Sequence, residues 1–159
     1  MAQPVDQSGP VETMMAADAA SRMLGIELLD HGEGWARVRL TVRDDMVNGH
    51  GICHGGVIFS LADTAFACAC NSWGPVTVAA GADISFIAPG RRGDVLTAEA
   101  RVRTRYGRSG IYDVAVTRGE RAERGQGRER GERAERGQGG EQVIAEFRGR
   151  SHELGNRRA

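Results

Sequence analysis

The sequence of 159 residues contains no lysine, few aromatic residues and only three cysteines. All 21 basic residues are arginines, and 21 acidic residues balance them, so the formal net charge is zero. A chain without net charge has no whole-molecule attraction for nucleic acid or for anionic lipid. We therefore expect no nucleic acid and no membrane among its partners, and any contact with a phosphate group must come from arginine or from the backbone.

Long apolar runs and paired cysteines are also missing. No apolar stretch reaches the length of about 18 residues that a membrane span needs, and the first residues, 1–4, lack the basic-then-apolar pattern of a secretion signal. Cys53, Cys68 and Cys70 are too few and too unevenly placed for a disulfide framework, and no second pair completes a zinc site. We expect a cytoplasmic protein with buried, reduced cysteines, no metal and no other cofactor.

Three segments have too little apolar content to fold by themselves. Residues 1–12 hold two prolines and one glycine, which predicts a flexible tail, and residues 156–159 form a second short tail. Residues 118–141 contain the sequence GERAERGQG twice, at 119–127 and 131–139. Such a segment cannot bury enough surface to offset its chain entropy, so we expect a disordered insert that lengthens a hairpin connection. Its charges nearly cancel and it has no aromatic residue, which argues against RNA binding.

Between the tails, the hydrophobic pattern predicts one domain over residues 13–155, interrupted by the insert. A short amphipathic helix is expected over 13–24, and residues 57–70, which are apolar nearly all round, predict a helix buried on most sides. Apolar and polar residues alternate in five stretches, which is typical of antiparallel strands: 36–42, 80–86, 96–102, 112–116 and 143–147. The predicted fold class is α+β, with a long central helix wrapped by an antiparallel sheet of five to six strands.

The most informative stretch runs from Asn48 to Gly56, directly before the central helix, and contains four glycines. Glycines permit close backbone approach, and the first turn of a helix offers unpaired N–H groups at the positive end of the helix dipole. This arrangement suits the developing oxyanion of acyl transfer. Two interpretations stay open for each polar side chain: His54 is catalytic or caps the turn, and Asn48 donates to a substrate or braces the loop.

Asp63 lies within the otherwise apolar helix. Burial should raise its pKa and its basicity; the alternative is that it only accepts hydrogen bonds from a neighbouring chain. Eight residues separate Asp63 from Gly55, about 12 Å along a helix, which is too far for both to act on one carbonyl. If both act together, the carboxylate must come from another subunit, so the chemistry predicts an active site at a dimer interface.

At this point the motifs resemble those of the PaaI-type hot-dog thioesterases of phenylacetate catabolism. The resemblance lies in Asn48-x-x-Gly51-x-x-His54-Gly55-Gly56, in FSLADTAFA at 59–67, and in the later segments DISFIAPG at 83–90 and GDVLTA at 93–98. It implies a hot-dog dimer, usually doubled to a homotetramer. It also implies hydrolysis of aryl-acyl-CoA esters, such as phenylacetyl-CoA or hydroxyphenylacetyl-CoA, to the free acid and CoA.

The resemblance also implies roles for individual residues. The Gly55 amide would polarise the thioester carbonyl, Asn48 and His54 would shape that pocket, and Asp63 of the facing subunit would attack the carbonyl or activate water. Substrate-binding candidates are Gly56 and, for the acyl group, Phe59 and Phe66, with Arg91 and Arg92 for the phosphates of CoA.

The sequence departs from the family in two places. Several relatives carry a hydroxyl near the position of Ala79 and Ala80, for which Thr77 is the candidate substitute, and the insert at 118–141 is not part of the family pattern. Two other functions compete: a non-catalytic acyl-CoA-binding or sensing module of the same fold, and a thioesterase for another acyl group, medium-chain or hydroxybenzoyl. The intact Asp63 favours the enzyme, because a binding module needs no buried carboxylate.

Overall fold

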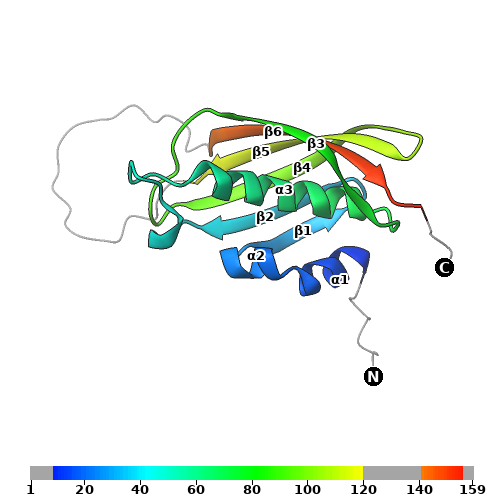
Figure 1. The fold of residues 1–159 in the computed structure, drawn as a ribbon, viewed down its shortest axis with the longest axis horizontal. Helices are drawn as coiled ribbons and strands as arrows, with labels where there is room; N and C mark the ends of the chain where they lie inside the picture. The colour runs from blue at the N-terminus through cyan, green and yellow to red at the C-terminus, as the bar shows by residue number, and fades with distance from the viewer. Residues whose placement is uncertain (1–8, 120–140, 156–159) are drawn as a thin grey trace, which may run out of the picture.

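The computed structural model describes residues 9–119 and 141–155 (Figure 1). In these ranges the helices are α1 (Pro10–Ala17), α2 (Ala19–Leu24), the short 3-10 helix η1 (Asp44–Met46) and α3 (Gly55–Asn71). The strands are β1 (Glu27–Gly32), β2 (Trp35–Thr41), β3 (Thr77–Phe86), β4 (Val95–Tyr106), β5 (Ser109–Arg118) and β6 (Gln142–Glu153). They form one antiparallel sheet in the order β1-β2-β4-β5-β6-β3.

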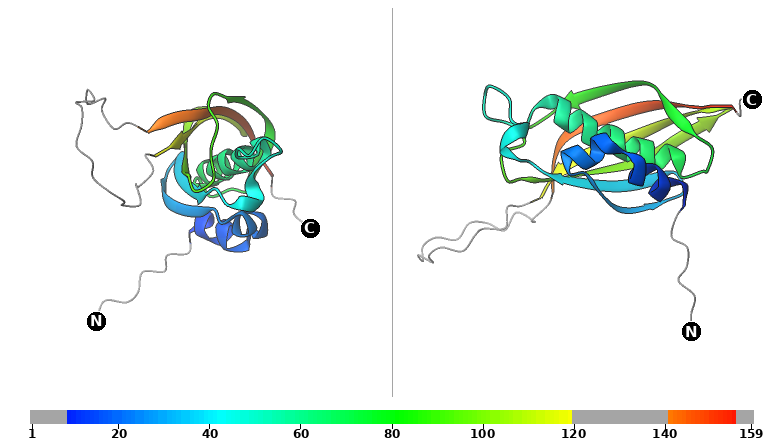
Figure 2. Two further views of the ribbon diagram at one scale, coloured as in Figure 1. Left: turned by 90° about the vertical axis from the view of Figure 1, so that its left-hand side faces the viewer. Right: turned by 60° about the horizontal axis from the view of Figure 1, so that its bottom comes forward.

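The sheet curls around α3 and encloses most of it (Figure 2). Side chains of α3 such as Leu61, Ala65 and Phe66 are buried against the inward residues of the strands, among them Val38 and Val114. Helix α3 is apolar nearly all round because sheet covers most of its circumference. The predicted hot-dog arrangement and the α+β class are confirmed, and α3 begins two residues before the expected helix at 57–70 and ends one residue after it.

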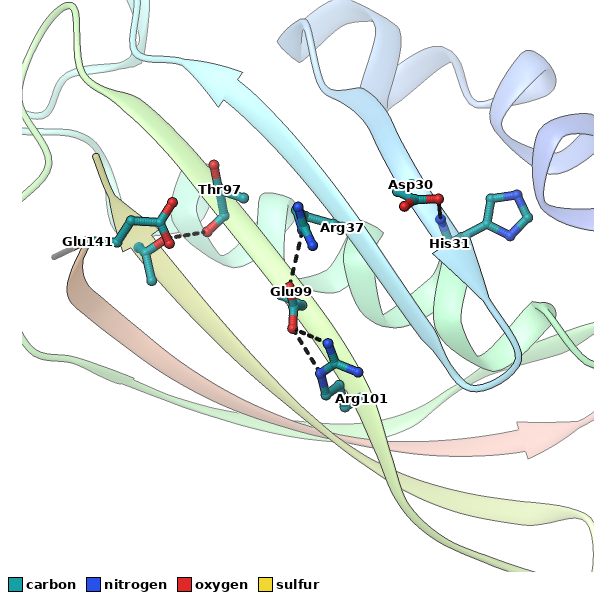
Figure 3. A network of polar contacts seen from close by, with 8 residues as sticks. Asp30, His31, Arg37, Thr97, Glu99, Arg101 and Glu141 are labelled. Carbon is teal, nitrogen blue, oxygen red and sulfur yellow. Dashed lines mark hydrogen bonds and ion pairs between the residues drawn. The ribbon is translucent and has the colours of Figure 1, made fainter. Parts of the chain in front are cut away.

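The outer face of the sheet carries charged side chains in opposed pairs (Figure 3). Arg37 on β2 lies directly across from Glu99 on β4 and donates to it at 3.1 Å, while Arg101 donates to the other oxygen of Glu99 at 2.8 Å. Their sequence neighbours Ala36, Val38 and Ala98 point inward and are buried. The alternation in the sequence therefore corresponds to the two faces of the sheet, as predicted.

The N-terminal helical segment differs from its prediction. Instead of one helix over 13–24, the chain forms α1 and α2, because Asp18 ends α1 and its side chain caps α2 by accepting from Ser21 N–H. The expected tail over 1–12 also ends earlier, since α1 begins at Pro10 and Val11 is fully buried. Proline suits the first position of a helix because that N–H has no intrahelical partner.

Strand β1 was not predicted from the sequence. Its two leucines, Leu28 and Leu29, are adjacent rather than alternating, and the pairing with β2 shifts register between Leu28 and Asp30. A bulge of this kind destroys the period-two pattern. The five predicted strands are all present with different bounds. For example, β4 and β5 keep pairing as far as Tyr106 and Ser109, beyond the alternating residues.

The repeat insert connects two paired strands. Arg118 at the end of β5 lies opposite Gln142 at the start of β6, so residues 119–141 join neighbours in the sheet, as expected for a long hairpin connection. Residues 1–8, 120–140 and 156–159 lie outside the described residues. The predicted disorder of the insert and of the tails concerns these residues and stays a prediction. None of the helices in the described part is long and apolar enough to cross a membrane.

Candidate active site

The N-terminus of α3 leaves one backbone N–H group unused. His54 is the N-cap residue, and its Nδ1 accepts a hydrogen bond from Gly56 N–H at 2.9 Å. Within the described residues, Gly55 N–H has no acceptor. Of the two interpretations of His54, the geometry supports the cap; when the ring is neutral, its proton is on Nε2. Gly55 N–H is thus available to an external carbonyl oxygen, aided by the helix dipole.

Asn48 braces the loop that leads into α3. Its side-chain Oδ1 accepts from the backbone N–H groups of His50, at 2.9 Å, and Ile52, at 3.3 Å. The backbone N–H of Asn48 donates to Ile52 O at 2.8 Å. The loop is held at its other end by His54 N–H, which donates to Met46 O. The side-chain oxygen of Asn48 therefore holds the loop, while its side-chain NH₂ group can still donate to a ligand. The geometry is compatible with both interpretations, that Asn48 braces the loop and that it donates to a substrate.

Asp63 is the partly exposed residue in a buried run. Its neighbours Leu61, Ala62, Thr64 and Ala65 are all buried. Burial raises the pKa of Asp63, and the nearby negative charge of Asp18 raises that pKa further. No side chain or backbone group in the described part of the protein donates a hydrogen bond to the carboxylate. A carboxylate that is partly desolvated and without donors is a stronger base than a solvated one, as predicted.

Asp63 shares one exposed stripe of α3 with three other residues. Gly56, Ser60, Asp63 and Ala67 are each exposed or half-buried, and their spacing of three to four residues places them on one helix face. Gly55 and Asp63 are not brought together in one chain, because both lie on the same straight helix, about 12 Å apart at ~1.5 Å per residue. The stripe is therefore the part of α3 that the chain's own sheet leaves open.

Phe86, on β3, lies directly against Gly55. A Cβ atom at position 55 would be 3.1 Å from Cζ of Phe86 and 3.4 Å from its Cε1. Phe86 is 55% exposed. A side chain at position 55 would therefore be crowded by this ring. The sequence pattern did not place Phe86 beside Gly55. A signal was present, since Phe86 lies in the family segment DISFIAPG, but alternation alone predicted an inward core residue.

The aromatic candidates on α3 have different positions. Phe59 is half-buried and its ring packs edge-on against Phe147, with 5.3 Å between the ring centroids. Phe66 is 1% exposed, and its ring fills the space over Gly149, where an added Cβ would be 2.8 Å away. Phe66 therefore belongs to the core, because the sheet closes over this side of α3, and its predicted contact with a substrate stays a prediction. Phe59 remains a candidate.

The arginine pair lies near the Asn48–Gly56 loop. The turn after β3 is joined to this loop by Cys53 N–H, which donates to Gly90 O at 2.8 Å. Arg91 N–H donates to Asp94 at 2.7 Å and its side chain is exposed, while Arg92 forms an ion pair with Asp44 at 3.4 Å. Both arginines thus belong to the end of the molecule that holds the N-terminus of α3.

Two other groups are poor candidates for chemistry. Thr77 donates its hydroxyl to Pro75 O at 2.9 Å and lies at the start of β3, next to the C-terminal end of α3, so its hydroxyl is already engaged.

All three cysteines are free and buried, as expected. Burial raises the pKa of Cys53 to about 11 and those of Cys68 and Cys70 to about 12, so none is a thiolate nucleophile at neutral pH. Among the described residues, no cluster of His, Cys, Asp or Glu could hold a metal ion.

Comparisons with known proteins identify the class of protein to which this fold and site belong. The Thioesterase superfamily profile matches residues 50–124. Over 142 residues the chain is 41% identical to the acyl-coenzyme A thioesterase PaaI of Escherichia coli strain K12, covering 89% of this chain and 87% of that protein. The chain belongs to the PaaI-type acyl-CoA thioesterases of this superfamily and is a thioester hydrolase.

Solved structures agree with this assignment. The PaaI protein of E. coli, described as part of the phenylacetic acid degradation operon, superposes with a TM-score of 0.78 at 40% identity, covering 92% of this chain and 91% of that chain. A mutant of the phenylacetic acid degradation protein PaaI from Thermus thermophilus superposes with a TM-score of 0.70 at 29% identity, covering 86% of this chain and all of that chain.

Proposed function

We propose that this thioesterase hydrolyses aryl-acyl-CoA esters, of the phenylacetyl-CoA or hydroxyphenylacetyl-CoA type, to the free acid and CoA in the cytoplasm. The names of the similar E. coli and T. thermophilus proteins refer to phenylacetic acid degradation, which supports an aromatic acyl group. The observation in this chain that carries the proposal is the pairing of an unused N–H at Gly55 with a partly desolvated carboxylate at Asp63 on the same helix.

Two copies of the chain would complete one site. In a two-fold dimer, residue i of one subunit meets residue j of the other and the reverse. If the two α3 helices run antiparallel across the axis near the level of Phe59, halfway between positions 55 and 63, then Gly55 of each subunit faces Asp63 of its partner. The open stripe on α3 supports this contact, since it exposes Gly56, Ser60 and Asp63.

The free edge of β3 supports the same dimer. Strand β3 ends the sheet, so one side of its backbone has no partner strand among the described residues. Val76, Val78 and Ile87, in or next to this strand, are 63%, 42% and 58% exposed. A long apolar edge of this kind invites pairing with another strand, and pairing with a second β3 would extend the sheet across the dimer. A tetramer of two such dimers remains the family expectation.

The chemistry follows from these positions. The thioester carbonyl oxygen would accept from Gly55 N–H, which then stabilises the negative charge of the tetrahedral intermediate. Asp63 of the facing subunit would either take a proton from water as the water oxygen bonds to the carbonyl carbon, or attack that carbon directly. Collapse of the intermediate breaks the C–S bond and releases the CoA thiolate. With water as the nucleophile this gives the free acid directly, whereas direct attack by Asp63 gives a mixed anhydride that water then cleaves to the free acid and the Asp63 carboxylate. Arg91 would contact the phosphates of CoA, and its exposure at this end of the molecule supports that role.

A thiol-release assay on a panel of CoA esters tests the proposal. The panel contains phenylacetyl-CoA, 4-hydroxyphenylacetyl-CoA, 4-hydroxybenzoyl-CoA and hexanoyl-CoA. We expect kcat/KM to be highest for the two phenylacetyl esters. A tenfold or greater preference for hexanoyl-CoA or 4-hydroxybenzoyl-CoA would overturn the aryl assignment, and stoichiometric binding without thiol release would overturn the catalytic one.

A further inference from the structure

The ring of Phe86 lies against Gly55, the residue whose N–H would bind the thioester carbonyl. The three heavy atoms nearest to a Cβ built on Gly55 all belong to this ring, at 3.1, 3.4 and 3.5 Å. The nearest is Cζ, so the ring points its tip at the first residue of α3. The ring thus borders the residue whose N–H has no acceptor in the described part of the chain.

Each of the other aromatic residues is held by contacts with other parts of the fold or lies at another place in it. The chain has four Phe, two Trp and two Tyr, and all eight lie within the described residues. Phe59 and Phe66 pack on Phe147, and Trp73 donates to Tyr112 OH at 3.0 Å near the far end of α3. Trp35 lies beneath Arg101 on the outer face of the sheet, and Tyr106 ends β4. Phe86 alone combines contact with Gly55 and a largely exposed ring.

We propose that Phe86 is the residue that selects an aromatic acyl group, by forming the wall of the acyl pocket beside the Gly55 amide. The inference rests on the proposed thioesterase function and names the residue that gives that function its preference. Aromatic rings attract one another in offset and edge-to-face contacts beyond the area they bury, an effect that corresponds to about two- to tenfold in affinity. A straight alkyl chain gains only the buried area from the same ring.

Replacing the ring tests this role. Phe86→Leu keeps an apolar side chain of similar reach and removes the aromatic face, and Tyr106→Leu is the matched control, because Tyr106 is also 54% exposed but ends β4 and lies outside the site. The readout is the ratio of kcat/KM for phenylacetyl-CoA to that for hexanoyl-CoA. We expect Phe86→Leu to lower this ratio about two- to tenfold, mainly through a higher KM for phenylacetyl-CoA. The ratio should be unchanged in Tyr106→Leu.

The outcomes separate this inference from the proposed function. If the unmodified protein hydrolyses neither ester, the proposed function fails. If it hydrolyses phenylacetyl-CoA but the ratio is the same in Phe86→Leu, the selector role is overturned and the proposed function stands. The molar mass of each variant is measured by light scattering; equal losses for both esters together with a change in mass would show that Phe86 is a subunit contact instead and would also overturn the inference.

Discussion

The two ends of α3 are built in opposite ways. At the N-terminal end, the Gly55 N–H has no acceptor in the described residues, the loop before it is exposed, and the ring of Phe86 stands open to solvent. At the C-terminal end, Asn71 is buried, and its side chain donates to Ala67 O and Thr77 O and accepts from Thr77 N–H. One end keeps a backbone donor without an acceptor among the described residues, and the polar groups of the other end are paired.

The closed end is reinforced by further contacts. Ser72 donates its hydroxyl to Ala69 O at 2.7 Å, and Trp73 donates to Tyr112 while the guanidinium of Arg105 lies 4.2 Å above its ring. The Ser72 hydroxyl pairs with one of the carbonyl groups at the helix end, and the Trp73 contacts fix the residues that follow it. The C-terminal end of α3 is thus tied to the sheet, whereas the N-terminal end keeps one donor free, which in the proposed mechanism binds the thioester carbonyl.

Among these variants, Asp63→Asn should lower the activity most. Asparagine keeps the size of the side chain and removes its basicity, so we expect kcat to fall by about 10²–10⁴-fold. Because burial raises the pKa of Asp63, its ionisation opposes folding, and this cost grows as the pH rises through the raised pKa. At pH 8, the unfolding temperature of the variant, measured by calorimetry, should therefore be equal to or higher than that of the unmodified protein. Turnover within a few-fold of the unmodified enzyme would contradict the assigned role.

Gly55→Pro removes the free donor itself. Proline is well tolerated at the first position of a helix and has no N–H, and the extended backbone of His54 is compatible with a following proline. We expect kcat to fall by about 10²–10³-fold, the usual effect of losing one oxyanion donor. Gly55→Ala is the control, because it brings a comparable contact with Phe86 but keeps the N–H. If the two variants lose activity equally, crowding by Phe86 and not the missing donor is responsible.

Asn71→Ala should affect the closed end in a different way. Loss of the Asn71 side chain removes the partner of Thr77 N–H and of Thr77 O, and one of the donors to Ala67 O, which should cost about 1–3 kcal/mol of unfolding free energy. Urea denaturation measures this loss. Thr13→Ala, an exposed position on α1, should change stability by no more than about 0.5 kcal/mol. A large fall in kcat of the folded Asn71→Ala protein would contradict the division between the two ends.

Asp18→Asn should give the smallest effect, a shift in pH dependence. Asparagine can still cap α2, and the negative charge that raises the pKa of Asp63 is removed. Because the carboxylate is the active form, activity is lost as the pH falls through the pKa of Asp63. Lowering that pKa moves the acid limb of kcat/KM to lower pH and leaves the plateau near neutral pH almost unchanged. An acid limb that stays in place would show that Asp18 has no influence on the base.

Local patterns in the sequence predicted the central helix, the five alternating strands and the glycine-rich turn, because each depends on residues near in sequence. The break at Asp18 was missed because Met14, Met15 and Leu24 keep helical spacing across it. Phe66 and Phe86 have the same side chain, and only the curl of the sheet decides that Phe66 is enclosed while Phe86 at the free edge is exposed. Which aromatic residue meets the site depends on tertiary structure, and periodicity does not report it.

Mixing two inactive variants tests most directly whether the site is shared between subunits. Asp63→Asn and Gly55→Pro chains are combined, dissociated and allowed to reassociate, and thiol release is measured. In a mixed dimer one site has both intact groups, so random exchange should restore about a quarter of the unmodified activity. If each chain uses its own Gly55 and Asp63, no mixed dimer contains an intact site, and activity that stays at the level of the separate variants would contradict the account.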